Sequence, residues 1–338
     1  MCDNAEISSR KLRVATRQSA LALAQTKMAA DAIATAAGIE YELVPLTTEG
    51  DRRLDKSLAS FGGKGVFIKE LEVALLEGRA DIAVHSLKDM PAEVLPEFKI
   101  AAVMNREDPR DAFVARGRAQ GTKFMDLPAG ARVGTGSIRR VVQLKSLRPD
   151  LEYVPIRGNI QTRLNKLEEL DGVVLAAAGL KRMGLEDQVT EYFGTEQVLP
   201  ASGQGILAIE TLSHPESNRH PEERSDEGSR FDRIQDMLSR VNHLPTYCIA
   251  VAEMAFLKAL NAGCQFPVAS FAEFVDATGS ATVAVAKKMK IRGIYWDEKS
   301  GKLLKASVVG EVDVASADAC AHARELGIAL AEKIREQL

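Results

Sequence analysis

The sequence predicts an α/β protein with two α/β lobes around a cleft and a small α+β domain at the C-terminal end. At 338 residues, the chain is too long for one ordinary hydrophobic core. Strand and helix patterns alternate along the first third, and the alternation restarts after residues 107–110. Beyond residue 265 it gives way to successive strands. We predict a discontinuous lobe 1 (1–106 with 204–242), a lobe 2 (107–203) and a third domain (243–338).

The first lobe opens with a strand, a capped helix and a second strand. Lys11–Thr16 is a short apolar run typical of a buried strand. Ser19 is a favourable N-cap for a helix that reaches Ala37, and Gly38 is a typical helix stop. Glu40–Thr47 predicts the second strand.

A loop separates these elements from the next helix and strand. Gly50–Gly65 has neither a helical nor a strand period and includes a Gly-Gly-Lys-Gly run, which predicts a loop. Val66–Glu77 has the spacing of an amphipathic helix closed by Gly78, and the strand Asp81–Val84 follows directly. This strand–helix–strand order predicts a doubly wound or related sheet.

The second lobe repeats the alternation, and a later strand is expected to rejoin the first sheet. The predicted elements are strands at Ala131–Gly134, Leu151–Ile156 and Gly172–Ala176, a helix from Ser137 to about Leu147, and a helix at Asn159–Leu170. Gly205–Thr211 has the pattern of a further strand that returns to the first sheet. Two such lobes would enclose a cleft, where ligands usually bind.

Residues 213–230 differ in composition from the rest of the chain. They include no hydrophobic residue, and the tripeptide His-Pro-Glu occurs twice among them. Such a segment cannot bury enough surface to fold alone, so we predict a disordered surface insertion that the fold tolerates.

The C-terminal third begins with helices and ends in a small domain. Two helices are expected from Phe231 to about Leu260, and Cys264 follows on a turn at the entrance to the domain. The remaining predicted elements are strands at Val268–Phe274, Thr282–Tyr295 and Leu303–Val312 and a helix from Ser316.

Composition narrows the possible functions. The net charge of -3 argues against bulk nucleic-acid binding, and no apolar run approaches the roughly 20 residues of a membrane-spanning helix. The polar start, Met1–Arg13, is unlike a signal peptide, so we expect a cytoplasmic protein. Its four cysteines lack CxxC spacing and are expected to be free thiols. No Cys/His cluster has zinc-site spacing, so no metal is predicted.

Positive charge is concentrated in the second lobe. Residues 130–170 include eight Lys or Arg and four Asp or Glu. Arg139 and Arg140 lie in the first turn of a predicted helix, where they oppose the helix dipole and a bound anion would relieve them. Arg157-Gly158-Asn159 repeats this arrangement at the next strand-to-helix turn, so both groups should face one crevice. The alternative is a solvated basic face.

Two further segments could carry chemistry. Asp89 follows a buried strand and could act as an acid/base group or stabilise a cationic intermediate, or it could simply form a turn paired with Lys88. His85 fits a hydrogen-bonded core residue better than a metal ligand. Cys264 could be an accessible nucleophile, although many lone cysteines are only small buried residues.

Taken together, these segments resemble the porphobilinogen deaminase family along nearly the whole chain, apart from 213–230. The stretches that carry the resemblance, in chain order, are Ala15–Ser19, Gly62–Gly65, Lys69–Glu72, Asp81–Asp89, Arg106–Phe113, Arg157–Asn159, Ala178–Arg182, Gly203–Gly205 and Gly263–Gln265. So many blocks in order and at matching spacing make the resemblance specific.

The resemblance implies a transferase that condenses four molecules of porphobilinogen head to tail into hydroxymethylbilane and releases ammonia. It implies that Cys264 holds a dipyrromethane cofactor by a thioether and that Asp89 is the catalytic aspartate. Each pyrrole carries an acetate and a propionate, so the site needs cations. The other implied cofactor-binding residues are Lys88, Ser19, Arg139, Arg140, Thr135 and Ser137. The implied substrate-binding residues are Arg17, Lys64, Arg157, Asn159, Arg163, Arg182 and Gln204.

Three positions depart from the family pattern, and two other interpretations stay open. Ala262 and Gly136 replace a common glycine and a common serine, and Met254 replaces an arginine, so one contact that docks the third domain is expected to be missing. A cytosolic two-lobed anion-binding module, with periplasmic-binding-protein-like lobes, is one alternative, and a weakened deaminase is the other. The family resemblance also implies a monomer.

Overall fold

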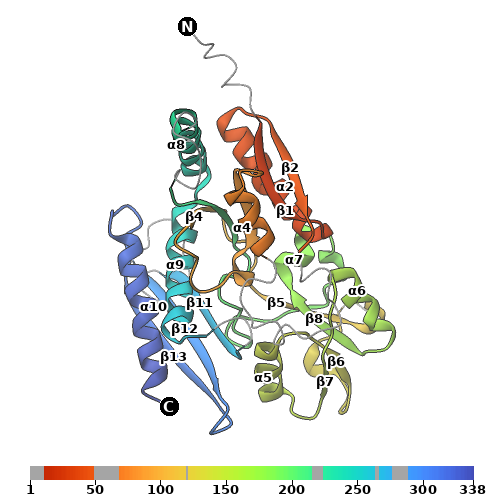
Figure 1. The fold of residues 1–338 in the computed structure, drawn as a ribbon. Coiled ribbons are helices and arrows are strands. Elements are labelled where there is room, and N and C mark those ends of the chain that lie inside the picture. The colour runs from red at the N-terminus through yellow and green to blue at the C-terminus, as the bar shows by residue number, and fades with distance from the viewer. Residues whose placement is uncertain (1–10, 49–67, 119–120, 215–223, 263–265, 276–287) are drawn as a thin grey trace.

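The computed structural model describes residues 11–48, 68–118, 121–214, 224–262, 266–275 and 288–338. These residues form two α/β lobes and a small C-terminal domain, each built around its own sheet (Figure 1). The predicted fold class is therefore confirmed. The exact domain boundaries given above stay a prediction.

The first sheet has the strand order β2-β1-β3-β10-β4. Its strands are β1 (Leu12–Arg17), β2 (Tyr41–Leu46), β3 (Ile82–Ser86), β4 (Phe98–Val103) and β10 (Leu207–Leu212). β1 pairs in parallel with β2 and β3, while β10 is antiparallel to both β3 and β4. The late strand thus returns to the first sheet, as the sequence predicts.

Helices cover both faces of this sheet. They are α2 (Ala20–Ala37), α4 (Lys69–Leu76) and α8 (Arg224–Val241). α2 and α8 share a hydrophobic core with Val14, Val84 and Ile209, whereas α4 packs with Ala15 and Ala83 on the opposite face. The predicted ends of α2 are confirmed: Ser19 accepts a hydrogen bond from the Ala22 amide, and Gly38 adopts a left-handed φ of 66°.

The second sheet has the order β7-β6-β8-β5-β9. Its strands are β5 (Asp111–Ala115), β6 (Arg132–Gly134), β7 (Glu152–Val154), β8 (Gly172–Ala176) and β9 (Glu191–Tyr192). Its helices are α5 (Ile138–Leu147), α6 (Ile160–Asn165) and α7 (Ala177–Arg182). α5 packs on one face through Leu144, and α6 and α7 pack on the other through Leu164 and Leu180.

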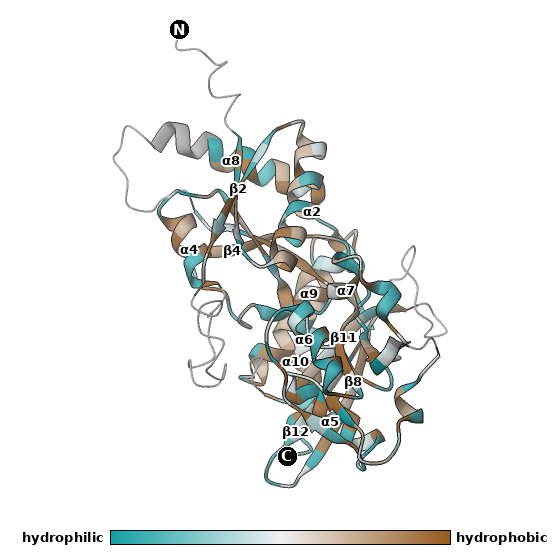
Figure 2. Ribbon diagram, turned by 90° about the vertical axis from the view of Figure 1, so that its right-hand side faces the viewer, coloured by the Kyte–Doolittle hydropathy of each residue, from teal (hydrophilic) through white to brown (hydrophobic). Residues whose placement is uncertain are grey.

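The C-terminal domain is an antiparallel sheet covered by two helices. Its elements are α9 (Leu244–Ala259), β11 (Val268–Val275), β12 (Lys288–Asp297), β13 (Lys302–Glu311) and α10 (Ala319–Arg335). The strands are in chain order, and α9 and α10 bury Phe256 and Leu330 against them. Figure 2 shows hydrophobic colour along central strands such as β11, and hydrophilic colour over much of α8.

The structure corrects the prediction for residues 213–230. α8 begins at Arg224, seven residues before the expected helix start at Phe231, so the end of this segment is helical and not disordered. Arg230 donates to both carboxylate oxygens of Asp81, at 3.0 and 2.6 Å, and Ile234 and Leu238 of the same helix are buried. These long-range contacts hold the helix from Arg230 onward, and composition cannot reveal them. Residues 215–223 lie outside the described residues.

Other differences concern element lengths and strands that the sequence pattern did not separate from their surroundings. β4 and β5 were not predicted, and the helix expected over Asn159–Leu170 ends at Asn165 and continues as a 3₁₀ turn at Lys166–Glu168. β5 is buried along its whole length, so it lacks the alternation by which a half-buried strand is found. The predicted loop Gly50–Gly65 lies outside the described residues.

Candidate functional site

The end of β3 brings several predicted site residues into one pocket. β3 runs into a 3₁₀ turn, Leu87–Asp89, which is anchored because Leu87 is fully buried and its amide donates to the Ile206 carbonyl. Asp89 is exposed on this turn. It lines a small pocket together with Arg17, Ser19 and His85. The sequence placed these residues on separate segments, and the fold brings them together.

Asp111, at the start of β5, binds both arginines of the Arg139-Arg140 pair. Arg139 Nη2 lies 2.8 Å from Asp111 Oδ2, and Arg140 Nη2 lies 2.7 Å from Asp111 Oδ1. Both arginine side chains are buried, and they also donate to the carbonyls of Leu199 and Val174. The predicted anion-binding pair is therefore partly neutralised by a carboxylate of the protein itself.

Gln204 contacts the same carboxylate. Its side-chain amide donates to Asp111 Oδ1 at 2.9 Å and to the Pro109 carbonyl at 2.7 Å. Burial alone would raise the pKa of Asp111, but Arg139 and Arg140 lower it well below its ordinary value. Asp111 lies in one of the stretches that carry the family resemblance, but no role is predicted for it from the sequence. The signal that could have found it is that two buried arginines need an acid nearby.

Positively charged side chains of both lobes shift one another's pKa values around Asp89. The pKa of Lys88 is lowered to about 8, mainly by burial; Arg140 and Arg139 contribute to this lowering, and Asp89 and Asp111 oppose it. Burial also lowers the pKa of Arg163, with a further lowering by Arg140 that Asp89 opposes. Four cations thus surround two carboxylates. This excess of positive charge suits a ligand that carries carboxylates.

The remaining predicted residues of the second lobe have local partners. Thr135 Oγ1 accepts from the Ser137 amide, and the Ser137 hydroxyl makes no capping hydrogen bond to α5. Asn159 caps α6 by accepting from the Thr162 amide at 2.9 Å. Arg157 contributes to the electrostatic environment of Arg163, whose Nε donates to the Gly158 carbonyl.

Arg182 lies where β10 enters the first sheet. It donates to the Gly205 carbonyl at 2.6 Å, and burial lowers its pKa to about 10, with Glu107 opposing the shift. Its Nε is buried and has no hydrogen-bond partner among the described residues, and the same holds for Nε of Arg139 and of Arg140. Two other predicted site residues, Lys64 and Cys264, lie outside the described residues.

The structure shows what surrounds two of the three positions at which the sequence departs from the family pattern. A Cβ atom at Gly136 would lie 2.6 Å from the Ile156 carbonyl oxygen, so this backbone leaves no room for a serine. Met254 is buried in the core of the C-terminal domain. An arginine there would have to bring its charge into that apolar core.

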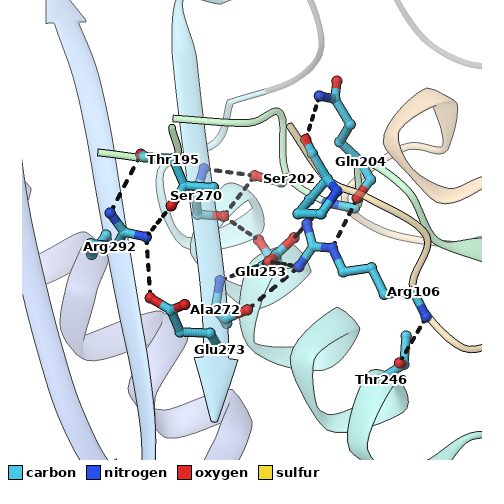
Figure 3. Close-up of polar contacts among 12 residues, drawn as sticks. Arg106, Thr195, Ser202, Gln204, Thr246, Glu253, Ser270, Ala272, Glu273 and Arg292 are labelled. Atoms are coloured by element: carbon cyan, nitrogen blue, oxygen red, sulfur yellow. Dashed lines mark hydrogen bonds and ion pairs between the residues drawn. The ribbon is translucent and has the colours of Figure 1, made fainter. Parts of the chain in front are cut away.

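Glu253, next to Met254, docks the C-terminal domain onto the segment between the lobes (Figure 3). Its fully buried carboxylate accepts from Arg106 Nη1 at 2.7 Å, from the Gly203 amide at 2.6 Å and from the Ala272 amide at 2.8 Å. Arg106 Nε donates in turn to the Gln204 carbonyl at 2.9 Å. Glu253 thus docks the domain through contacts that do not involve Met254.

The described residues offer no group of three or more His, Cys, Asp or Glu side chains that could hold a metal ion. No described helix is long and apolar enough to cross a membrane. The fold and the cation cluster together define a multidomain α/β protein with a site suited to carboxylate ligands.

Comparison with known proteins shows to which family this chain belongs. Residues 12–220 match the family model described as "Porphobilinogen deaminase, dipyromethane cofactor binding domain", and residues 247–336 match "Porphobilinogen deaminase, C-terminal domain". The chain belongs to the porphobilinogen deaminase family, whose members are enzymes, and its cofactor is the dipyrromethane that the first of these domains binds.

Curated relatives cover nearly the whole chain. The porphobilinogen deaminase of Clostridium kluyveri is 44% identical over 301 residues, which are 88% of this chain and 93% of that protein. Those of Clostridium acetobutylicum and Syntrophus aciditrophicus are 42% and 43% identical and cover 96% of this chain, and 99% and 94% of their own lengths. Among solved structures, immunogenic lipoprotein A from Vibrio vulnificus matches weakly, with 12% identity, a TM-score of 0.39 and coverage of 71% of this chain and 98% of its own.

The described residues fit a dipyrromethane. Such a group carries two carboxylates on each of its two pyrroles, and four cations outnumber two carboxylates at the site. Lys88, Arg139 and Arg140 are the residues that could hold these carboxylates, with Ser137 as a neutral donor.

Proposed function

We propose that the protein condenses four porphobilinogen molecules head to tail into hydroxymethylbilane and releases one ammonia for each. The observation that carries this proposal is the convergence of cations from two lobes on the turn that presents Asp89. The ordered match to porphobilinogen deaminases supports it independently.

Asp89 is the residue we assign to the chemical step. Loss of ammonia from porphobilinogen leaves an electron-poor, positively charged pyrrole, which a nearby carboxylate stabilises. Asp89 is exposed at the pocket, whereas Asp111 is fully buried and occupied by two arginines. Of these two carboxylates, Asp89 is thus the one that can meet a substrate.

The cations are assigned to binding and orientation. We propose that Arg17, Lys64, Arg157, Arg163 and Arg182, with Asn159 and Gln204, hold the carboxylates of successive substrates. Lys88, Arg139 and Arg140, with Ser19, Thr135 and Ser137, hold those of the cofactor. When bound, the dipyrromethane supplies the pyrrole carbon to which the first substrate is joined. Guanidinium forks suit this task because they bind carboxylates in pairs of hydrogen bonds.

Cys264 is proposed as the attachment point. The mass of the intact protein tests this: we expect an excess of two linked pyrrole units, which Cys264→Ala abolishes and the control Cys320→Ser retains. An unmodified wild-type protein that binds carboxylates without consuming porphobilinogen would instead support the anion-binding module. Cofactor with very slow turnover would support a weakened deaminase.

The proposal includes a monomeric protein acting in the cytoplasm on a small molecule, without nucleic acid or membrane. Light scattering of the purified protein is expected to give the mass of one chain, 36.6 kDa plus the cofactor. A dimer at micromolar concentration would contradict the monomeric state.

A further inference from the structure

The turn that presents Asp89 depends on contacts from outside for its position. This Asp89 turn is a single 3₁₀ turn, Leu87–Asp89, and the Met90 amide closes it by donating to the Leu87 carbonyl at 3.0 Å. Ser86 precedes the turn, and its side chain makes no capping hydrogen bond to it. Because so short a turn has few hydrogen bonds of its own, neighbouring segments must hold it in place.

A second turn, Gly203–Ile206, packs directly against the first. Its Ile206 amide donates to the Gly203 carbonyl at 3.1 Å, and its Ile206 carbonyl accepts from the Leu87 amide at 3.0 Å. A Cβ atom at Gly203 would lie 2.8 Å from Leu87 Cγ and 3.0 Å from the backbone nitrogen of Lys88. Gly203 also has a left-handed φ of 73°. Both the conformation and the close contact therefore require a glycine here.

The C-terminal domain fixes the position of Gly203. The Gly203 amide donates to Glu253 Oε2 at 2.6 Å, and Glu253 is a fully buried side chain of α9. The other carboxylate oxygen, Oε1, accepts from the Ala272 amide of β11 at 2.8 Å and from Arg106 Nη1 at 2.7 Å. A continuous series of contacts thus runs from the C-terminal domain through Gly203 to the Asp89 turn.

We propose that Gly203 is a positioning residue that places Asp89 and Lys88 for the reaction, and that the C-terminal domain sets its position through Glu253. This inference rests on the proposed function, in which Asp89 stabilises a positively charged pyrrole. That stabilisation depends on close placement of the carboxylate, and a displacement of about 1 Å can cost about 100-fold in rate. The roles proposed above do not use Gly203. The Asp89 turn thus reaches its active geometry only while the C-terminal domain is docked.

Gly203→Ala tests the positioning role, because the new methyl group must displace Leu87 and Lys88. We expect the variant to keep the dipyrromethane mass, with kcat lowered by about 10- to 100-fold and KM little changed. Gly38→Ala is the matched control. Gly38 has a similar φ of 66°, so the backbone strain is comparable, but a Cβ atom there meets no atom of the described residues within 4 Å. Its kcat should equal that of the wild type.

A spectroscopic readout separates displacement of the turn from a general loss of stability. With isotope-labelled lysine, NMR reports the backbone amide of Lys88, which lies directly beside Gly203. The Lys88 amide signal should move in Gly203→Ala and stay in place in Gly38→Ala. A loss of stability elsewhere in the molecule would not move this signal in the folded protein.

Glu253→Gln tests the contribution of the C-terminal domain. The side-chain oxygen of the glutamine can keep the contacts with Ala272 and Arg106, which turns the new NH2 group toward the Gly203 amide and removes that hydrogen bond. Below the first melting transition, the Lys88 amide signal should therefore move and kcat should fall. Glu273→Gln removes another carboxylate of this domain, one that pairs with Arg292, and should change neither.

The inference requires both changes in Gly203→Ala, so an unmoved Lys88 signal or a wild-type kcat overturns it. If Gly203→Ala does not fold, the same two readouts in Glu253→Gln decide, and the absence of either change overturns the inference. A wild type without cofactor or turnover, or an Asp89→Ala variant with wild-type turnover, contradicts the proposed function instead. The Lys88 signal would then still report the contact between the two turns.

Discussion

Asp111 shows how one side chain sets the arrangement of a whole charge cluster. Two adjacent arginines at a helix start would repel each other and the helix dipole. Asp111 accepts from both of them and from Gln204, and so fixes three predicted site residues in one geometry. The two arginines together keep a net positive charge after pairing with Asp111. This charge is near Lys88 and Asp89, where the ligand is proposed to bind.

Asp111→Asn should destabilise the protein by about 3–5 kcal/mol at pH 7, because it leaves a buried arginine without its countercharge. The pKa of Asp111 is lowered, so its contribution is fully present above the unfolded pKa of 3.8 and is lost as pH falls below it. The variant should therefore lose less stability than the wild type on acidification. Urea unfolding from pH 7 to pH 3 measures both effects. Asp150→Asn, which removes the charge of an exposed carboxylate paired with Arg148, should change little.

Asp89→Ala should keep the fold and carboxylate binding but reduce turnover by about 100-fold or more, because the cationic intermediate loses its stabilising carboxylate. Porphobilinogen consumption at saturating substrate is the measurement, and intact mass confirms that the cofactor is present. Turnover near the wild-type rate would refute the role assigned to Asp89.

Helix α8 illustrates how an element can be held by a partner far away in the sequence. Its start belongs to a segment without a hydrophobic residue. Arg230 nevertheless binds Asp81, a side chain that also accepts from Arg13. The helix then buries Ile234 and Leu238 against the first lobe. The last part of the predicted insertion 213–230 is thus a structural element of the first lobe.

Arg230→Met should lower the free energy of unfolding by about 1.5–3 kcal/mol, since charge-assisted hydrogen bonds to a buried carboxylate are lost. Arg240→Met, on the same helix, removes an exposed pair with Asp236 and serves as the control with a much smaller effect. Chemical denaturation compares the two.

Deletion of residues 215–223 should leave turnover within about twofold of wild type, because surface insertions are usually tolerated. The variant that lacks residues 213–230 should be less stable than the variant that lacks residues 215–223, because it also loses Arg230. Thermal melting and porphobilinogen consumption distinguish the two deletions, and equal stability would show that the Arg230–Asp81 pair contributes nothing.

At the scale of the whole molecule, Glu253 connects parts that the sequence separates widely. It joins α9, β11, Arg106 and the segment that leads into β10 (Figure 3). Arg106 and Gly203 flank the two chain crossings between the lobes. The position of the C-terminal domain is thereby tied to the position of the lobes.

Glu253→Gln should cost about 3–5 kcal/mol, because one buried acceptor becomes a donor and Arg106 loses its countercharge. We expect the C-terminal domain to melt separately from the lobes and to be released earlier in limited proteolysis. Glu273→Gln, whose partner Arg292 is 3.2 Å away and whose side chain is less buried, is the control. A single melting transition at the wild-type temperature would contradict the docking role.

Much of the fold follows from local patterns. Ser19 and Gly38 bound α2 as predicted, and the alternation of strands and helices correctly indicates two α/β lobes. β4 and β5 were missed because their patterns do not distinguish them from neighbouring segments. α8 was shortened because a composition rule cannot include the contact with Asp81.

The sequence by itself determined the fold class, the family and the residue types of the site, since each depends on short-range spacing or on ordered motifs. Only the tertiary structure decided which side chains meet. It placed Asp111 between Arg139 and Arg140, His85 beside Glu210, and Arg106 against Glu253. Each of these pairs joins distant segments, and a charge in the linear sequence gives no sign of its partner. Burial makes such pairs obligatory, and burial is a property of the folded chain alone.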